Sequence, residues 1–215
     1  MYTRILFLGD SVAAETAIGF VPMTVRILSD TVDVSVSSVN SSVPSSNVLD
    51  LLDRVQELLP TQTDPFAVAC ILVGINDSKI LAQFHEPLVP LALFGSRLRM
   101  LVERLEGTGS TVALCGLPDL HFARIEANKA LREFWYWKPE DYHAYNAVIR
   151  DLAGASHTRA FVDLDAAFKA GQADLDMLFG PDGVHPSALG HAVIADAVSA
   201  GLASLLRGSH CTVTG

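Results

Sequence analysis

Asp182 and His185 are the first pair of residues in this sequence that could do chemistry together. They lie three positions apart in the segment Pro181–Pro186, with a glycine between them. This spacing lets the carboxylate reach the imidazole within one turn of backbone, where it fixes the tautomer and stabilises the imidazolium that forms when histidine takes a proton. The flanking prolines and the glycine indicate a loop. Taken alone, the segment also fits a surface turn that carries an incidental histidine.

Ser11 is the candidate nucleophile. It ends the tripeptide Gly9-Asp10-Ser11, which follows the apolar run Ile5–Leu8 directly. A serine in this place lies at the carboxyl edge of a sheet and near the amino end of the next helix, where its backbone N–H can face an anion. Taken alone, Ser11 is explained more simply as the cap of that helix.

Asn76 stands after another apolar run, in Gly74-Ile75-Asn76-Asp77. A side-chain amide at the end of a strand can donate a hydrogen bond into the cleft where Ser11 would lie, as an oxyanion-hole donor must. Taken alone, the same residues fit an ordinary Asn-Asp turn.

Short apolar runs alternate with longer helical patterns along the whole chain. The expected strands are Thr3–Leu8, Val32–Ser37, Phe66–Val73, Thr111–Cys115 and Ala160–Leu164. The expected helices are Phe20–Leu28, Asn47–Leu59, Pro90–Leu105, Pro139–Leu152 and Ser187–Leu206. This alternation predicts an α/β fold: a doubly wound, five-stranded parallel sheet with helices on both faces and its ligand beyond the carboxyl ends of the strands.

We expect residues 1–215 to form one domain, because no repeat, low-complexity tract or linker interrupts the pattern. Two connections, 78–93 and 117–138, are longer than needed and leave the carboxyl ends of strands, so we expect them to cover the cleft. The second holds Trp135 and Trp137. They fit equally well as an apolar wall for the substrate or as core residues that anchor the insertion.

Composition excludes some classes of partner. The net charge is −9 and the 15 Lys and Arg residues are scattered, which argues against a nucleic-acid partner. The run Phe66–Ile75 is about half the roughly 20 residues that a membrane span needs. The stretch Ala188–Leu206 is longer, but His191 and Asp196 interrupt it, so an amphipathic helix is expected and no membrane span.

The cysteines and the N-terminus predict a cytoplasmic protein. Cys70 and Cys115 lie in apolar runs and Cys211 in the tail, an odd and sparse set that fits neither a disulfide framework nor a metal site. The first residues, Met1–Arg4, lead directly into a strand rather than into a secretory leader. No zinc-ligand spacing and no Gly-rich phosphate loop is visible, so no cofactor is implied. The six other histidines are expected to be structural or surface residues: His85, His121, His143, His157, His191 and His210.

The three blocks around Ser11, Asn76 and His185 together resemble the SGNH hydrolases, also called the GDSL esterase/lipase family. They occur in the family's order over nearly the whole chain, and four further residues agree: Pro118, Asp163, Phe179 and Gly190. The resemblance implies a flavodoxin-like fold of the SGNH type. It implies Ser11 as nucleophile, His185 as base and Asp182 as the residue that orients the base. The backbone N–H of Ser11 and the side chain of Asn76 would be two of three oxyanion donors.

The sequence departs from the family at the third donor, which is the backbone N–H of a glycine after the second strand. Aligning Val39–Ser46 with that block places Ser45 at the glycine. Any residue but proline keeps the N–H, so the oxyanion hole can survive the change. Serine adopts a positive φ less cheaply than glycine, and its side chain crowds the cleft.

The resemblance implies hydrolysis of a small-molecule carboxylic ester through an acyl-enzyme on Ser11. Acyl transfer to an alcohol or amine is the alternative, because triad and oxyanion hole serve both reactions. A non-catalytic binding module is the third reading, and the presence of Ser11, Asn76, Asp182 and His185 counts against it. The sequence specifies neither the acyl group nor the oligomeric state.

Overall fold

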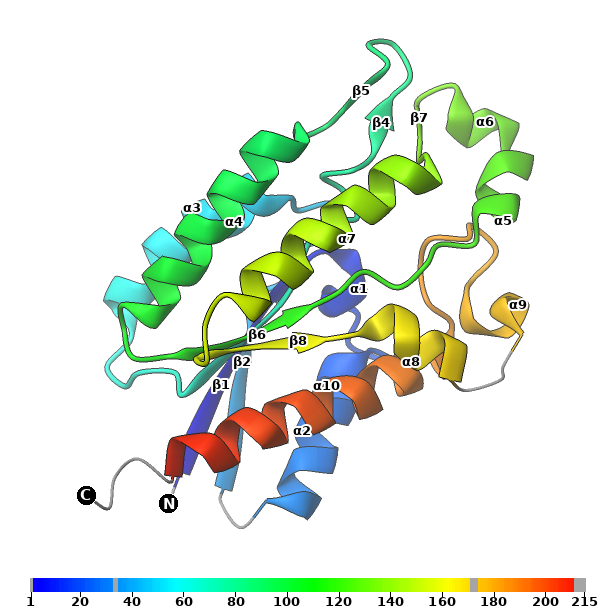
Figure 1. Cartoon of the computed structure of the whole chain (residues 1–215). Helices are drawn as coiled ribbons and strands as arrows, with labels where there is room; N and C mark the ends of the chain where they lie inside the picture. Colours follow the sequence, from blue (N-terminus) through cyan, green and yellow to red (C-terminus); the bar gives the residue numbers. More distant parts are fainter. Residues whose placement is uncertain (1, 33–34, 171–173, 211–215) are drawn as a thin grey trace.

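A computed structural model of the chain describes residues 2–32, 35–170 and 174–210 (Figure 1). Its centre is a five-stranded parallel sheet in the order β2-β1-β3-β6-β8, which confirms the expected α/β fold. The strands are β1 (Tyr2–Gly9), β2 (Ser35–Asn40), β3 (Val68–Leu72), β6 (Thr111–Cys115) and β8 (Arg159–Val162). The strand order reverses between β1 and β3, and in such sheets the ligand crevice opens beyond the carboxyl ends of the strands at this point.

Helices cover both faces of the sheet (Figure 1). One face carries α2 (Phe20–Thr31), α8 (Leu164–Ala170) and α10 (Ala188–His210), and the other carries α3 (Val48–Leu58), α4 (Leu91–Glu106) and α7 (Pro139–Gly154). Shorter helical segments are α1 (Ser11–Ala14), η1 (Leu59–Thr61), α5 (Phe122–Ala127), α6 (Lys129–Arg132) and α9 (Leu175–Leu178). Because both faces are covered, the central strands are apolar without alternation, and every residue of β3 is buried.

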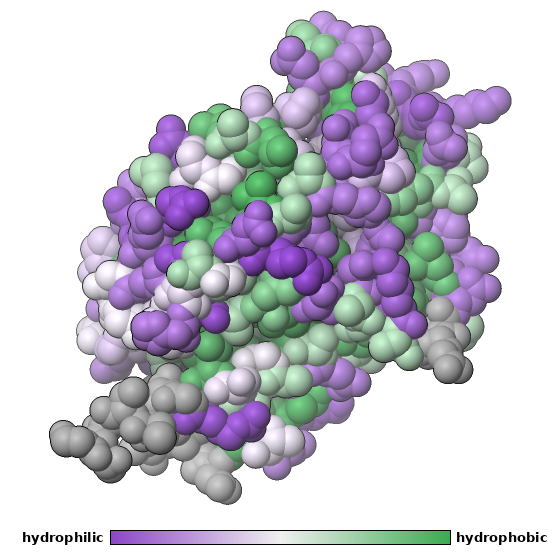
Figure 2. Space-filling view, in the orientation of Figure 1, coloured by the Kyte–Doolittle hydropathy of each residue, from purple (hydrophilic) through white to green (hydrophobic). Residues whose placement is uncertain are grey.

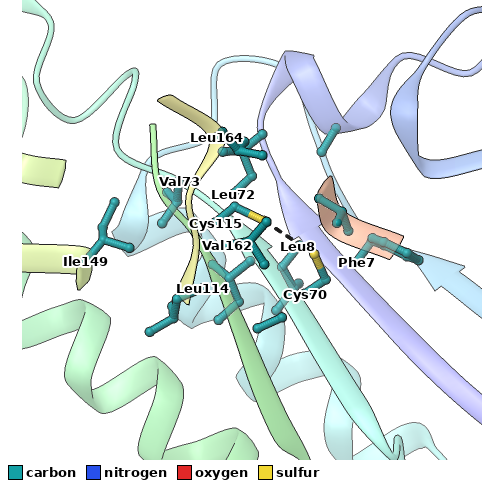
Figure 3. Packing of buried hydrophobic residues seen from close by; sticks show 14 of the residues in the cluster. Phe7, Leu8, Cys70, Leu72, Val73, Leu114, Cys115, Ile149, Val162 and Leu164 are labelled. Atoms are coloured by element: carbon teal, nitrogen blue, oxygen red, sulfur yellow. Dashed lines mark hydrogen bonds between the residues drawn. The ribbon is translucent and has the colours of Figure 1, made fainter. Parts of the chain in front are cut away.

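The core between the layers is built from these strands and the apolar stripes of the helices (Figure 3). Cys70 of β3 and Cys115 of β6 are buried in it as free thiols, as expected, with their Sγ atoms 3.6 Å apart. Cys211 lies outside the described residues.

The start of α3 positions the segment that precedes it. Asn47 accepts hydrogen bonds from the backbone N–H groups of Leu49 and Asp50, and the Asp50 carboxylate accepts one from the N–H of Asn47. This reciprocal capping satisfies N–H groups that a helix otherwise leaves without partners. It holds the chain just after Ser45 in place.

The second strand lies later in the chain than the predicted range of 32–37. Helix α2 runs to Thr31, and the N–H of Val32 still bonds to the carbonyl oxygen of Leu28 at 2.9 Å. The strand that pairs with β1 is Ser35–Asn40, which lies at the edge of the sheet. Most of its residues are polar, so a search for apolar runs does not predict its position. At the other edge, Leu164 belongs to α8 rather than to β8.

The two long connections come together in a small antiparallel sheet of order β5-β4-β7 (Figure 1). Strands β4 (Ile80–Leu81) and β5 (Glu86–Pro87) come from the first connection, and β7 (Trp135–Tyr136) comes from the second. Segments more than 50 residues apart in the sequence are therefore fastened beside each other. The sequence pattern does not predict this sheet, because its strands have two residues each.

Helix α10 is apolar over Ala188–Arg207, with a mean hydropathy of 1.6 and half of the stretch buried inside the fold. By length and composition it is the one helix among the described residues that could cross a membrane, a test that buried core helices also pass. It packs against α2, α8 and the sheet. On the face of the molecule in Figure 2, hydrophilic residues are spread over the surface with hydrophobic ones between them.

Candidate active site

The structure brings Ser11, His185 and Asp182 into one hydrogen-bonded line. Ser11 Oγ lies 2.8 Å from His185 Nε2, and His185 Nδ1 lies 2.5 Å from Asp182 Oδ2. Ser11 is the first residue of α1, directly after β1, whereas Asp182 and His185 lie in the loop between α9 and α10. A hydroxyl, an imidazole and a carboxylate in this order can activate the hydroxyl as a nucleophile.

Asp10, rather than Ser11, caps helix α1. Its Oδ1 accepts the backbone N–H of Val12 at 3.0 Å. The hydroxyl of Ser11 is thereby left to interact with His185, so the helix-cap explanation of Ser11 is wrong. Burial raises the pKa of Asp10 to about 6, against the lowering effects of the Val12 hydrogen bond and of the nearby His185.

The Asp182–His185 pair shifts the pKa of both partners. Burial by itself would raise the pKa of Asp182, but hydrogen bonds from the His185 side chain and from the backbone N–H groups of His185 and Val184 outweigh it and lower the pKa to about 2. The hydrogen bond to Asp182 raises the pKa of His185 above its ordinary value, against the effect of burial. The carboxylate is therefore ionised, and it stabilises the protonated imidazole.

Asn76 lies beside this line, just beyond β3. Its Nδ2 donates to the carbonyl oxygen of Ser46 at 3.1 Å and to Asp10 Oδ2 at 3.3 Å. A carbonyl oxygen can only accept, so the bond to Ser46 orients the amide.

Ser45 has a φ of +65°, the left-handed conformation that glycine adopts most easily. This is the position that the alignment assigned to the family's glycine. In the described part of the chain, neither the N–H of Ser45 nor that of Ser11 donates a hydrogen bond to another protein group. Both residues line one pocket with Asn76.

The pocket has a volume of about 330 Å³ and contains every site residue that the sequence analysis proposed. Its lining consists of Ser11, Val12, Pro44, Ser45, Ile75, Asn76, Lys79, Leu131, Trp135, Trp137, Asp182, Val184 and His185. The two tryptophans both line this pocket but differ in burial. Trp135 is 36% exposed at the pocket wall, whereas Trp137 is buried and its Nε1 donates to the carbonyl oxygen of Ile75 at 2.8 Å.

Arg124 of α5 is a residue that the sequence analysis missed. Its Nη1 donates to the carbonyl oxygens of Phe179 at 2.9 Å and Gly180 at 3.0 Å, and its Nη2 bonds to the carbonyl oxygen and carboxylate of Asp176. Its guanidinium thus holds the chain that leads to Asp182. No sequence signal marks this role, because it depends on contacts more than 50 residues away.

Gly183, between Asp182 and His185, allows α5 to approach the same loop. Its φ is +75°, and its carbonyl oxygen accepts the N–H of His121 at 2.9 Å. A Cβ at this position would lie 2.7 Å from the carbonyl oxygen of His121. The glycine therefore permits both the turn of the loop and its contact with the insertion.

The other histidines whose side chains are described lie outside the pocket lining. His121 and His143 bond to Asp176 and Asp119, each at 2.7 Å, and His191 is buried against Phe20. The side chain of His210 lies outside the described residues. Among the residues with described side chains, no group of three or more His, Cys, Asp or Glu could hold a metal ion.

Solved structures share this fold over nearly the whole chain. A lipase/acylhydrolase from Enterococcus faecalis is 18% identical, with a TM-score of 0.75 over 92% of this chain and 94% of that one. TesA is 20% identical, with a TM-score of 0.71 over 94% and 99% of the two chains. A catalytic mutant of Axe2, an acetylxylan esterase from Geobacillus stearothermophilus, is 23% identical, with a TM-score of 0.68 over 91% and 92%. No curated protein sequence matches the chain.

The sequence model of the GDSL-like lipase/acylhydrolase family matches residues 7–193, from the middle of β1 into α10. The match takes in the Gly9-Asp10-Ser11 block, Asn76 and the loop with Asp182 and His185. The chain accordingly belongs to the GDSL-like lipase/acylhydrolase family and is an ester-hydrolysing enzyme.

Proposed function

We propose that this enzyme hydrolyses the carboxylic ester of a small molecule through an acyl-enzyme on Ser11. The observation that carries the proposal is the contact of 2.8 Å between Ser11 Oγ and His185 Nε2, at the end of the line from Asp182. The contact lies in the wall of a pocket that Asn76 and Ser45 also line. These are the groups that acyl transfer to a serine requires.

In the first half of the reaction, Ser11 Oγ attacks the carbonyl carbon and its proton passes to His185 Nε2. The C–O bond to the alcohol then breaks, and His185 returns the proton to the departing alkoxide. In the second half, water gives a proton to His185 and its oxygen bonds to the acyl carbon. The Ser11–acyl bond breaks, the serine recovers its proton, and the acid is released. Asp182 stays ionised throughout and stabilises the imidazolium.

The oxyanion that forms in each half needs donors that are placed before the reaction. We assign the backbone N–H groups of Ser11 and Ser45 and the side-chain amide of Asn76 to this role. The two N–H groups donate to no other protein group in the part of the chain that the structure describes. Asn76 is held by Ser46 and Asp10, and the longer bond, to Asp10, is the one that an oxyanion would displace.

We also propose that residues 1–215 act as one domain whose two insertions, 78–93 and 117–138, cover the cleft. The proposal is supported by Lys79 from the first insertion and by Leu131, Trp135 and Trp137 from the second, all of which line the pocket. Exclusion of water strengthens the electrostatic interactions in such a site.

We further propose the cytoplasmic location that the sequence predicts, and cell fractionation tests it.

The test is labelling with a fluorophosphonate probe, combined with turnover of a panel of acyl esters of varied chain length. Ser11→Ala should fold normally, lose labelling and lose on the order of 10⁴–10⁶ in turnover. His185→Ala should cost a similar amount and the double variant little more, because the two act as a unit. Ser96→Ala is the matched control, since Ser96 lies on the surface of α4 and outside the pocket. If Ser11→Ala keeps more than a few per cent of the turnover, the assignment is wrong.

A further inference from the structure

Lys79 contributes a positive charge to the wall of the pocket. It lies between the turn that carries Asn76 and strand β4, at the start of the first insertion. Its Nζ donates to Asn76 Oδ1 at 3.4 Å and lies 5.0 Å from the centre of the Trp135 ring. Among the described residues, Lys79 forms no ion pair with a carboxylate.

The surroundings of Lys79 do not compensate its charge fully. Burial lowers the pKa of its ammonium, and the charge of Asp10 acts against this effect. Asp10 itself is buried and directs its oxygens at Val12 and Asn76. The ammonium of Lys79 is half-buried, and its partners are a neutral amide and an aromatic face. An anion that binds beside it therefore stabilises its charge.

Among the described residues that line the pocket, Lys79 is the only lysine or arginine, so an anion finds no second permanent cation there. Asp182 and His185 are hydrogen-bonded to each other. His185 must also be neutral to act as a base. The remaining wall is mainly apolar, with Leu131, Trp135 and Trp137 on the insertion side. A substrate that satisfies this pocket has an apolar stem and one negatively charged group that reaches Lys79.

The position of Lys79 indicates which part of the ester carries the charge. The leaving oxygen must take its proton from His185 Nε2, so the alcohol part departs on the side of the Asp182–His185 loop. Lys79 instead bonds to Asn76, the oxyanion donor. The group beside Lys79 is therefore expected to belong to the acyl part.

Building on the serine-hydrolase function proposed above, we propose that Lys79 binds a carboxylate on the acyl part of the substrate. The preferred substrates are then half-esters of short dicarboxylic acids, with a size that suits a pocket of about 330 Å³.

The test compares ethyl hydrogen glutarate with ethyl pentanoate, by titration of the acid released. The measured quantity is the ratio of kcat/KM for the anionic ester to kcat/KM for the neutral one. Lys79→Met keeps the aliphatic stem and should lower this ratio roughly ten- to hundredfold, mainly through KM of the glutarate ester. Lys79→Arg should keep the ratio within about threefold, because it retains the charge. Lys169→Met, which removes a surface lysine on α8, is the matched control. It should also keep the ratio within about threefold of the wild-type value.

Wild-type protein provides a second measurement that does not depend on the folding of a variant. Added salt should lower the ratio, because it screens the attraction between Lys79 and the carboxylate. A ratio that is unchanged in Lys79→Met overturns the proposal, and so does an equal loss with both esters, which would place the effect on Asn76. A third ester has a neutral acyl part and carries its carboxylate on the alcohol part. It tests whether Lys79 binds a carboxylate on the acyl part or on the alcohol part. A larger loss with that ester than with the glutarate overturns the assignment to the acyl part.

Failure of the underlying function gives a different result. In that case Ser11→Ala would hydrolyse ethyl pentanoate at the wild-type rate, whatever the effect of Lys79→Met. If Ser11→Ala is inactive and the ratio does not respond to Lys79→Met, only the role of Lys79 is refuted.

Discussion

The side-chain amide of Asn76 donates a hydrogen bond of 3.1 Å to the carbonyl oxygen of Ser46. The next residue in the chain, Asp77, accepts the N–H of Val48 at 2.9 Å, at the start of α3. Two successive residues beyond β3 therefore hold the segment that follows Ser45. The proposed donors Asn76 and Ser45 are joined by this segment, so we expect them to keep their relative position when the substrate binds.

The left-handed backbone of Ser45 predicts the effect of two substitutions. Ser45→Gly and Ser45→Ala both keep the backbone N–H, so each should keep activity within about tenfold. The glycine variant should be more stable than the alanine variant by about 1 kcal/mol, because only glycine adopts a φ of +65° without strain. Unfolding in urea measures the difference. Proline is unsuitable at this position, because its φ is fixed near −65°.

Asn76→Ala is the comparison for these variants. It removes a proposed donor and should cost roughly 10²–10³ in kcat. Equal stability of the glycine and alanine variants would contradict the left-handed conformation. A loss above about a hundredfold in both would show that the reaction uses the Ser45 hydroxyl.

The rate should depend on pH through His185. The protonated imidazole cannot accept the proton of Ser11, so kcat/KM should rise with pH and reach a plateau. The hydrogen bond to Asp182 raises the pKa of His185, so the midpoint should lie above the ordinary value of 6.5. Asp182→Asn should move the midpoint to lower pH and lower the plateau by roughly 10²–10⁴. The measurement is kcat/KM from about pH 5 to pH 9, with an ester whose chemical step limits the rate.

His143→Gln is the control for this profile, because His143 bonds to Asp119 and does not line the pocket. Its midpoint should match that of the wild type. A flat profile in the wild type would argue against His185 as the base.

Arg124 is expected to act as a positioning residue for Asp182 and His185. Arg124→Ala removes donors to the carbonyl oxygens of Phe179 and Gly180 and should lower kcat by roughly ten- to hundredfold, with a smaller change in KM. Arg124→Lys should restore little, because an ammonium cannot reproduce the planar fork. Steady-state kinetics measure both constants.

Arg150→Ala controls for the loss of a surface arginine, since Arg150 pairs with Asp163 outside the pocket. We expect its kinetics to remain within about twofold of the wild type. If Arg124→Ala changes only the melting temperature and leaves kcat unaltered, Arg124 is structural and does not position the site.

The buried carboxyl of Asp77 should make a contribution to the free energy of unfolding that falls as pH rises. Burial raises its pKa to about 7 in the folded protein, and the charges of Asp10 and Asp50 act in the same direction, against its backbone hydrogen bonds. The folded state therefore binds a proton at Asp77 more tightly than the unfolded state does. This protonation stabilises the folded state at low pH, and the effect is lost as pH rises through about 7. Asp77→Asn resembles the protonated form. Its stability relative to wild type should improve by about 2 kcal/mol between roughly pH 5 and pH 8, measured by urea unfolding.

Asp176→Asn provides a control of opposite sign. The hydrogen bond from His121 and the charge of Arg124 lower the pKa of Asp176, so its stabilising effect is present above the ordinary pKa and is lost in acid. This variant should lose stability relative to wild type at pH 8. If the stability of Asp77→Asn relative to wild type instead falls as pH rises, as expected for Asp176→Asn, the pKa of Asp77 is lowered rather than raised in the folded state.

The sequence by itself determined the layers of the fold and the residues of the proposed triad. Long apolar runs such as the one that forms β3 predict buried parallel strands, because both faces of such strands are covered. Asp182 and His185 were recognisable because their contact spans three residues and is therefore local. Ser11 and Asn76 follow strands at the edge of the sheet where parallel strands end together. Each of these inferences depends on a pattern within one short segment.

Only the tertiary structure decided how these segments meet. The contact between Ser11 and His185 joins residues 174 positions apart, and Lys79 and Trp135 meet through a sheet whose strands have two residues each. Strands this short are too brief for a periodic pattern, and they form because partner strands supply their hydrogen bonds. The role of Arg124 and the φ of Ser45 arise in the same way, since distant carbonyl groups and the fastening of the Ser45 loop impose them. Local residue preferences contain no information about such partners, because the free energy that selects them comes from long-range contacts.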